Sequence, residues 1–143
     1  MRLLLTGAAT LAGAEVLKHL LLRPELDRVL LFMPNDETVS TRLVQRLESF
    51  LGTIPPSVSV VTGDLRLPRF GLSAAAWEQF VTSFDIGVHC AQRETKDQDL
   101  EAARQFNHLP IESWIDLLER NPDVRLHHLS TAFTAGTRHG LYT

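Results

Sequence analysis

The amino-acid sequence predicts an α/β fold, a doubly wound parallel sheet of about five strands in the order 3-2-1-4-5. Two observations predict this fold. Short apolar runs alternate along the chain with segments whose apolar residues recur at helical spacing. Several of these runs are apolar on both faces, which is typical of strands in a parallel sheet with helices on both sides. Right-handed crossovers between consecutive strands then lead to the stated order.

The segment before Pro24 predicts the first strand and the first helix. Arg2–Thr6 is an apolar run that ends at Gly7, and a helix is expected over about Leu11–Leu22, closed by Pro24. A secretion signal is the alternative for this segment. That alternative accounts for only half of the residues, whereas a strand, a glycine turn and a helix account for all of them.

The next elements are a strand, a helix and a strand. Arg28–Met33 is a run typical of a buried strand, and it stops at Pro34-Asn35-Asp36. Glu37–Leu51 has apolar residues at helical spacing, and Val58–Val61 is the third strand. The pattern so far repeats the strand–helix unit of a parallel sheet.

The remaining elements continue this alternation. Ser73 is placed to cap a helix that carries large apolar side chains, and Phe84–His89 is the fourth strand. Gln98–Arg120 is predicted to be mostly helical, with a kink at Pro110. Val124–Leu129 is the fifth strand.

Composition limits the class of protein. The 143 residues suffice for one domain, and 44% hydrophobic with 22% charged residues is typical of a folded globular chain. A net charge of −3 without a basic block disfavours nucleic acid and anionic membranes as partners. The single cysteine, Cys90, excludes an internal disulfide framework. No metal site is expected, since neighbours such as His127 and His128 on a strand face opposite sides.

The turn between the first strand and the first helix is the strongest candidate for a binding site. It reads Thr6-Gly7-Ala8-Ala9-Thr10-Leu11-Ala12-Gly13. Backbone amides at the helix start can receive a pyrophosphate, while Gly7 permits a tight turn and Gly13 permits close helix–strand packing. A plain strand–helix turn with two helpful glycines is the alternative.

Several motifs together resemble one family. They are TGxxxxxG, VVTGDLRLPRFGLS followed by Trp77, DIGVHCA, Asn107 and HHLSTAFTAG. This series resembles the extended short-chain dehydrogenases/reductases, in their thioester-reductase branch. That branch contains terminal reductase domains of nonribosomal peptide synthetases, carboxylic acid reductases and fatty acyl-CoA reductases.

The resemblance implies a function. Residues 1–143 would be the N-terminal, NAD(P)-binding part of a Rossmann-type fold, truncated relative to the full family fold and without its substrate-binding region. The reaction would be hydride delivery to an acyl thioester on an acyl carrier protein or coenzyme A, which releases an aldehyde or alcohol. The resemblance also implies a cytoplasmic protein.

The resemblance assigns the cofactor to a set of positions. They are Thr6, Gly7, Thr10, Leu11, Gly13, Arg42, Asp64, Leu65, Ala91 and Asn107. Asp64 and Leu65 match the pair that holds the adenine ring. Thr10 replaces the family's middle glycine, and its side chain would either crowd the diphosphate or bond to it. Cys90 and Gln92 replace the usual asparagine and alanine.

NADPH is the favoured cofactor, and NAD is the alternative. Where the family places an arginine for the 2′-phosphate, this chain has Met33-Pro34, so only Arg42 matches a family arginine. Losing one charged hydrogen bond to the 2′-phosphate removes about 1.5–3 kcal/mol of binding free energy, which weakens the preference for NADPH over NADH. Asp36 would take a ribose hydroxyl or cap the following helix.

The catalytic residues are only partly present. Thr131 matches the family's catalytic Ser/Thr, but the single tyrosine, Tyr142, leaves no room for the lysine of Tyr-x-x-x-Lys. We therefore expect no reduction by the 143 residues alone. The alternative function is a non-catalytic, degenerate Rossmann module that binds a nucleotide or a partner. The residues that favour it are Thr10, Met33, Pro34, Cys90 and Gln92. A sugar-nucleotide enzyme is a third alternative, against which the GLSxxxW segment argues.

An uncovered edge at the fifth strand would promote homo-oligomers.

Overall fold

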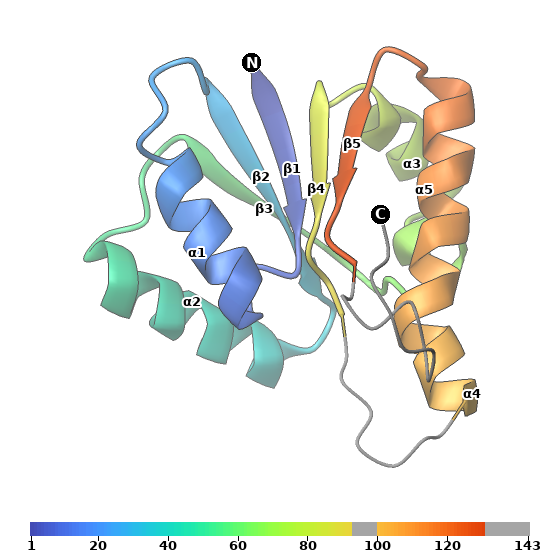
Figure 1. Ribbon diagram of the computed structural model, residues 1–143, viewed down its shortest axis with the longest axis horizontal. Coiled ribbons are helices and arrows are strands. Elements are labelled where there is room, and N and C mark those ends of the chain that lie inside the picture. The colour runs from blue at the N-terminus through green and yellow to red at the C-terminus, as the bar shows by residue number, and fades with distance from the viewer. Residues whose placement is uncertain (93–99, 131–143) are drawn as a thin grey trace, which may run out of the picture.

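A computed structural model describes residues 1–92 and 100–130 (Figure 1). Within these residues, five parallel strands form one sheet in the order β3-β2-β1-β4-β5, which confirms the predicted order. The strands are β1 (Arg2–Thr6), β2 (Arg28–Pro34), β3 (Val58–Gly63), β4 (Ile86–His89) and β5 (Arg125–His128).

Helices cover both faces of the sheet. On one face lie α1 (Leu11–Leu20) and α2 (Glu37–Leu51), and on the other lie α3 (Ala74–Val81) and α5 (Leu109–Arg120) (Figure 1). A 3₁₀ turn, η1 (Pro68–Gly71), precedes α3. No described helix is long and apolar enough to cross a membrane.

The segment 98–120, predicted to be mostly helical, is helical over all of its described residues, although its first half is not a regular α-helix. Of that range, residues 98 and 99 lie outside the described residues, and α4 (Leu100–Ala103) is followed by a π-helical turn, η2 (Arg104–His108). There the N–H of Leu109 donates to the carbonyl of Arg104, five residues back. Pro110 has no backbone N–H, so it cannot donate the α-helical hydrogen bond that would join α5 to this turn. The α5 helix begins at Leu109, with Pro110 in its first turn.

Two apolar cores form because β1 and β2 alternate their side chains between the two faces. Leu3 and Leu5 pack with α1 and α2, whereas Leu4 faces an aromatic cluster under α3 and α5. That cluster comprises Phe32, Phe70, Trp77, Phe80, Phe84 and Trp114. Trp77 and Trp114 are fully buried in it. Phe84, predicted to begin the fourth strand, lies in this cluster and precedes β4, which begins at Ile86.

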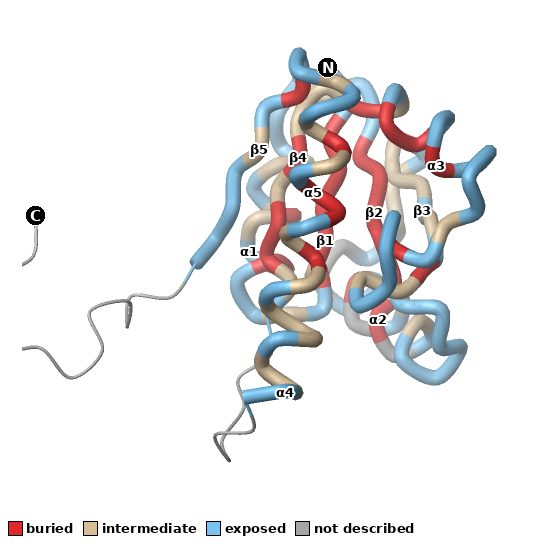
Figure 2. Tube along the Cα trace, turned by 90° about the vertical axis from the view of Figure 1, so that its right-hand side faces the viewer, coloured by how far each residue is buried: buried red, intermediate tan, exposed pale blue. Residues whose placement is uncertain are grey.

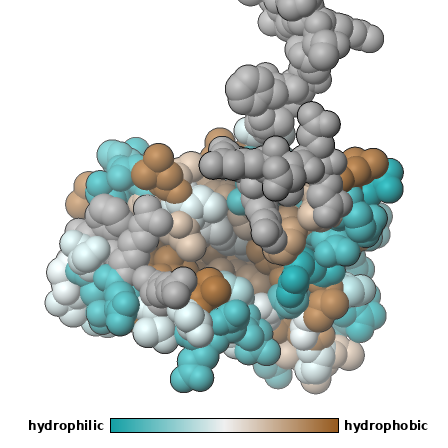
Figure 3. Space-filling view, turned by 90° about the horizontal axis from the view of Figure 1, so that it is seen from below, coloured by the Kyte–Doolittle hydropathy of each residue, from teal (hydrophilic) through white to brown (hydrophobic). Residues whose placement is uncertain are grey.

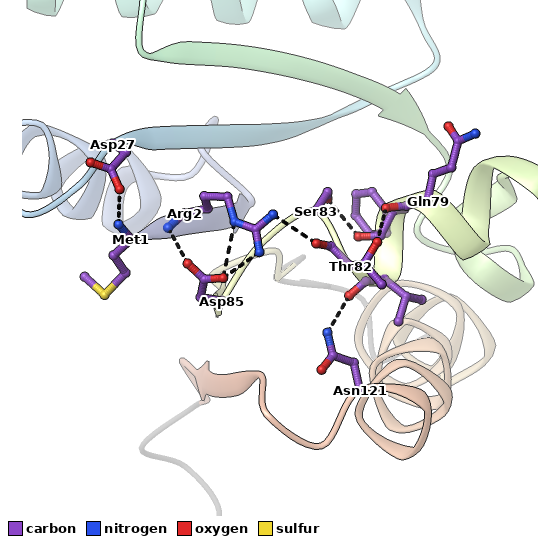
Figure 4. A network of polar contacts seen from close by, with 10 residues as sticks. Met1, Arg2, Asp27, Gln79, Thr82, Ser83, Asp85 and Asn121 are labelled. Atoms are coloured by element: carbon purple, nitrogen blue, oxygen red, sulfur yellow. Dashed lines mark hydrogen bonds and ion pairs between the residues drawn. The ribbon is translucent and has the colours of Figure 1, made fainter.

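The amino ends of the strands are joined by polar contacts (Figure 4). The backbone N–H of Arg2 donates to Asp85 Oδ2 at 2.7 Å, and its guanidinium donates to Asp85 Oδ1 at 2.7 Å and to the carbonyl of Thr82 at 3.0 Å. Asn121 donates to the carbonyl of Val81 at 2.9 Å. The exposed contacts of Arg2 join β1 to the segment before β4, and the part-buried contact of Asn121 joins the end of α5 to α3, at the end of the sheet away from the glycine turn.

The strand at one edge, β5, differs from the central strands. Figure 2 shows β1 and β2 largely buried, whereas Arg125, His127 and His128 of β5 are exposed. Its outer side pairs with no strand within the described part of the chain. Association of copies through this edge stays a prediction.

Gly87 sets how closely α5 approaches β4. A Cβ at this position would lie 2.6 Å from Cη2 and Cζ3 of Trp114. We therefore expect Gly87→Ala to lower the free energy of unfolding by about 1–3 kcal/mol through overpacking. Trp114→Phe removes these two ring atoms, so the double variant should lose less stability than the two single variants added together. Strict additivity in urea unfolding would contradict the contact.

Candidate functional site

A pocket of about 520 Å³ lies at the carboxyl ends of the strands. It is lined by Gly7, Ala8, Ala9, Thr10, Phe32, Pro34, Asn35, Asp36, Val39, Leu43, Gly63, Asp64, Leu65, Arg66, Ala91, Gln92 and Phe106. Figure 3 looks onto this end of the sheet and shows apolar side chains toward its middle, with hydrophilic ones around them. The pocket lies where doubly wound sheets bind ligands, beside the switch between β1 and β4.

The glycine turn is built by close backbone approach. Gly7 has φ +79°, and a Cβ there would lie 2.3 Å from the backbone N of Ala91. A Cβ on Gly13 would lie 2.1 Å from the carbonyl oxygen of Gly7. Both positions therefore require glycine, one for the turn against β4 and one for the packing of α1 over it.

Thr10 serves the turn itself. Its hydroxyl accepts from the N–H of Gly13 at 2.9 Å and donates to the carbonyl of Gly7 at 2.9 Å, so it caps α1. The carbonyl of Cys90, at 3.4 Å, is a longer alternative for the single hydroxyl proton. The sequence left open whether this side chain crowds or bonds a phosphate, and neither choice anticipated its capping role.

The loop after β3 folds back onto the strand end. The N–H of Asp64 donates to the carbonyl of Phe70 at 2.9 Å, and a Cβ on Gly63 would lie 2.4 Å from that oxygen. Arg69 and Phe70 both have φ 55°, a left-handed conformation that costs about 1–2 kcal/mol per residue. Complete burial of the Phe70 ring offsets this strain and fixes the loop.

Asp64 is held by its neighbour Arg66. Arg66 Nε donates to Asp64 Oδ1 at 2.9 Å, Nη2 donates to Oδ2 at 2.6 Å, and the Arg66 N–H donates to Oδ1 at 2.9 Å. These hydrogen bonds hold the pKa of the Asp64 carboxyl below its usual range. Leu65 lies between the two on the pocket wall.

At the end of β2, Asp36 is the N-cap of α2. Its Oδ1 accepts from the N–H groups of Thr38 at 2.9 Å and Val39 at 3.1 Å. The capping alternative for Asp36 is therefore confirmed, and Asp36 also lines the pocket. Arg42 belongs to α2, but its side chain lies outside what the structure describes.

Thr6 and His89 join the ends of β1 and β4. Thr6 Oγ1 and His89 Nδ1 form a hydrogen bond of 2.6 Å, and both side chains are fully buried. His89 Nε2 finds no partner among the described residues, and the ring stacks on His128 with centroids 5.2 Å apart. Burial, with the charge of His128 added, lowers the pKa of His89 to about 4.

The other predicted positions have different places. Ala91 lines the pocket, whereas Leu11 is exposed at the start of α1 and does not. Asn107 lies in η2, beside the lining residue Phe106. Thr131, like Tyr142, lies outside the described residues. Burial raises the pKa of the Cys90 thiol. No group of three or more metal-ligating side chains occurs in the described part of the chain.

Three contributors to the site escaped sequence reasoning, namely Arg66, Phe106 and His89. Arg66 directly follows the Asp64–Leu65 pair, so its position was a usable signal. Phe106 gave no such signal, because it comes forty residues later and reaches the pocket only through the fold. His89 is in the DIGVHCA motif, where the alternation of a strand pattern could have predicted that it faces inward.

A parallel sheet with this order and a glycine turn at the start of α1 defines a dinucleotide-binding fold of the Rossmann type. Residues 5–143 match the NAD-binding family that is described as Male sterility protein, and the chain belongs to that family. The resemblance stated from the motifs is thereby confirmed.

Relatives agree with this assignment. The chain is 31% identical to the nonribosomal peptide synthetase-like enzyme fsqF of Aspergillus fumigatus, over 94% of this chain and 10% of that protein. It is 28% identical to fatty acyl-CoA reductase 1 of Gallus gallus, over 91% of this chain and 28% of that protein. Among solved structures, the terminal R domain from the myxalamid PKS-NRPS biosynthetic pathway matches with a TM-score of 0.79 and 26% identity, over 91% of this chain and 34% of that one. The chain thus spans only a minor part of these proteins.

The contribution of the Thr10 cap to stability can be measured. Thr10→Val keeps the shape of the side chain but removes the hydroxyl, so we expect the free energy of unfolding to fall by about 1 kcal/mol. Thr10→Ser keeps the hydroxyl and should stay close to the unsubstituted protein. The urea midpoint measures both, and equal midpoints for Val and Ser would contradict the capping role.

The lowered pKa of His89 predicts that the protein loses stability in acid. The folded-state pKa of about 4 lies below the ordinary value of 6.5, so between these values the unfolded chain binds the proton more readily. The contribution of His89 is complete above pH 6.5 and is lost as the pH falls toward 4, by up to about 3 kcal/mol. Urea unfolding across this window should show a shallower pH dependence in His89→Asn. His19→Asn, at an exposed site of α1, is the control, and an equal change in slope would contradict the assignment.

Proposed function

We propose that residues 1–143 form the NAD(P)-binding Rossmann domain of a reductase that acts on acyl thioesters. The observation that carries the proposal is the pocket at the carboxyl ends of the strands, bordered by the Gly7–Gly13 turn and the start of α1. Family membership and the relatives among peptide synthetases and fatty acyl-CoA reductases support the choice of chemistry.

The pyrophosphate of the dinucleotide would lie at the start of α1. There the first turn of the helix presents backbone N–H groups, and its dipole favours an anion. The side chain of Ala9 is exposed and lines the pocket at this point, so it leaves room for a phosphate. On this proposal Asp64 and Leu65 hold the adenine, and Ala91 borders the nicotinamide half.

NADPH is the cofactor we favour, with NADH as the alternative. Arg42, in α2, is the residue proposed to meet the 2′-phosphate, because α2 borders the pocket through Val39 and Leu43. Asp36 lines the same region and would repel a phosphate, so the preference for NADPH is expected to be modest.

The bound cofactor would supply a hydride to the carbonyl carbon of a thioester carried by an acyl carrier protein or coenzyme A. The chain's proposed part is to orient that carbonyl, with the hydroxyl of Thr131 as its hydrogen-bond donor. Asn107, in η2, is proposed to support this arrangement. We place the reaction in the cytoplasm.

A carboxylate placed at the pyrophosphate site tests the proposal. We expect Ala9→Asp to weaken NADPH binding more than about tenfold, because it sets a negative charge against the phosphates. Ala75→Asp makes the same change at an exposed position in the first turn of α3, away from the pocket, and should bind like the unsubstituted protein. Isothermal titration calorimetry with NADPH and NADH measures both affinities.

Two outcomes would contradict the proposal. Absence of binding of either dinucleotide to the unsubstituted protein would exclude the cofactor site, and equal affinities for the two aspartate variants would move it away from α1. Binding without NADPH oxidation by the full-length protein in the presence of an acyl-CoA would instead favour the non-catalytic nucleotide-binding module.

A further inference from the structure

Arg66 is fixed in position on the wall of the pocket. Its Nε and Nη2 donate to the two carboxylate oxygens of Asp64, a two-point contact that holds the guanidinium in one plane. The side chain nevertheless keeps 48% of its surface exposed, against 27% for Asp64. A planar group is thus held rigid while much of it still faces the pocket or solvent.

The Arg66 guanidinium lies over an aromatic ring from another part of the chain. The Arg66 Cζ lies 5.3 Å from the ring centroid of Phe106, within the range of a cation–π contact. Phe106 belongs to η2, so the contact joins the loop after β3 to the π-helical turn before α5. Asp64, Arg66 and Phe106 all line the same pocket.

The chemistry of this trio suits a flat, uncharged ring better than a phosphate. Of the described residues that line the pocket, Arg66 alone is cationic, and its charge is balanced by Asp64 at 2.6 Å. A phosphate would have to compete with that carboxylate and approach its negative charge. The half-exposed guanidinium offers a delocalised plane, on which a nucleobase can stack.

We propose that Asp64, Arg66 and Phe106 form a stacking platform for the adenine base, in which the guanidinium of Arg66 lies between the Phe106 ring and the base. This inference rests on the proposed function, because it takes the pocket to be the dinucleotide site. It adds Arg66 and Phe106 as residues that set affinity for the adenosine half. Arg66 would stack on the face of the adenine base, with Phe106 on the other side of the guanidinium. The Asp64–Leu65 pair would instead contact the edge of the base.

The test uses 5′-AMP as the probe and two substitutions of Arg66. Arg66→Lys keeps the positive charge and can still pair with Asp64, but it has no planar group. Arg66→Met keeps an unbranched stem against Phe106 without charge or plane. We expect both variants to bind 5′-AMP at least about fivefold more weakly in isothermal titration calorimetry, with the loss persisting at high salt. Arg23→Met, at an exposed position after α1, is the matched control and should bind as the unsubstituted protein does.

The outcomes separate stacking from charge. Unchanged affinity in Arg66→Lys would overturn the platform, since charge alone would then suffice. Unchanged affinity in Arg66→Met, or no binding of 5′-AMP to the unsubstituted protein, would also overturn it. Phe106→Leu should reproduce part of the loss while leaving the Asp64–Arg66 pair in place, and circular dichroism checks that each variant is folded. If 5′-AMP binding depends on Arg66 but the full-length protein transfers no hydride, the proposed reaction fails and the platform stands.

Discussion

The close approach of α1 to the end of β1 is the constraint on which the rest of the site depends. At Gly13 the helix passes so near the carbonyl of Gly7 that no side chain fits between them. This approach fixes the first turn of α1 over the strand end, so that its backbone N–H donors begin next to the pocket-lining residue Thr10. Any larger residue at Gly13 would push the helix away and move those donors out of place, whatever the lining side chains are.

The same constraint extends to the neighbouring strand. Gly7 approaches the backbone of Ala91, and the N–H of Cys90 donates to the carbonyl of Thr6 at 3.0 Å. The buried Thr6–His89 hydrogen bond adds a side-chain link between β1 and β4. Backbone contacts therefore hold the ends of β1 and β4 together beside the pocket. Because Cys90 takes part through its backbone N–H, this contact does not depend on which side chain stands at that position.

The sequence allowed most of the fold to be predicted, because its information is local. The α2 helix has the predicted bounds, and its start at Asp36 follows from a side-chain cap within three residues. The region around Pro110 was harder, because a helical pattern does not distinguish an α-helical turn from the π-helical turn of η2. The contact between Arg66 and Phe106 was beyond reach for a different reason. It joins residues forty positions apart and exists only once the sheet brings η2 beside the loop after β3.

Charge decides how such a pocket can hold a dinucleotide. Its described lining carries two carboxylates, Asp36 and Asp64, and one guanidinium, so side chains give it no excess of positive charge. The pyrophosphate of such a ligand must then rely on the backbone N–H groups and dipole of α1, which act only within the first turn. This attraction is short-ranged and does little to steer an anionic ligand toward the pocket, whereas lysine and arginine side chains in the lining would do so. Affinity for the adenosine half has to come from contacts with the base and ribose, which makes the loop after β3, strained at Arg69 and Phe70 and fixed by the buried Phe70 ring, as important to the site as the glycine turn.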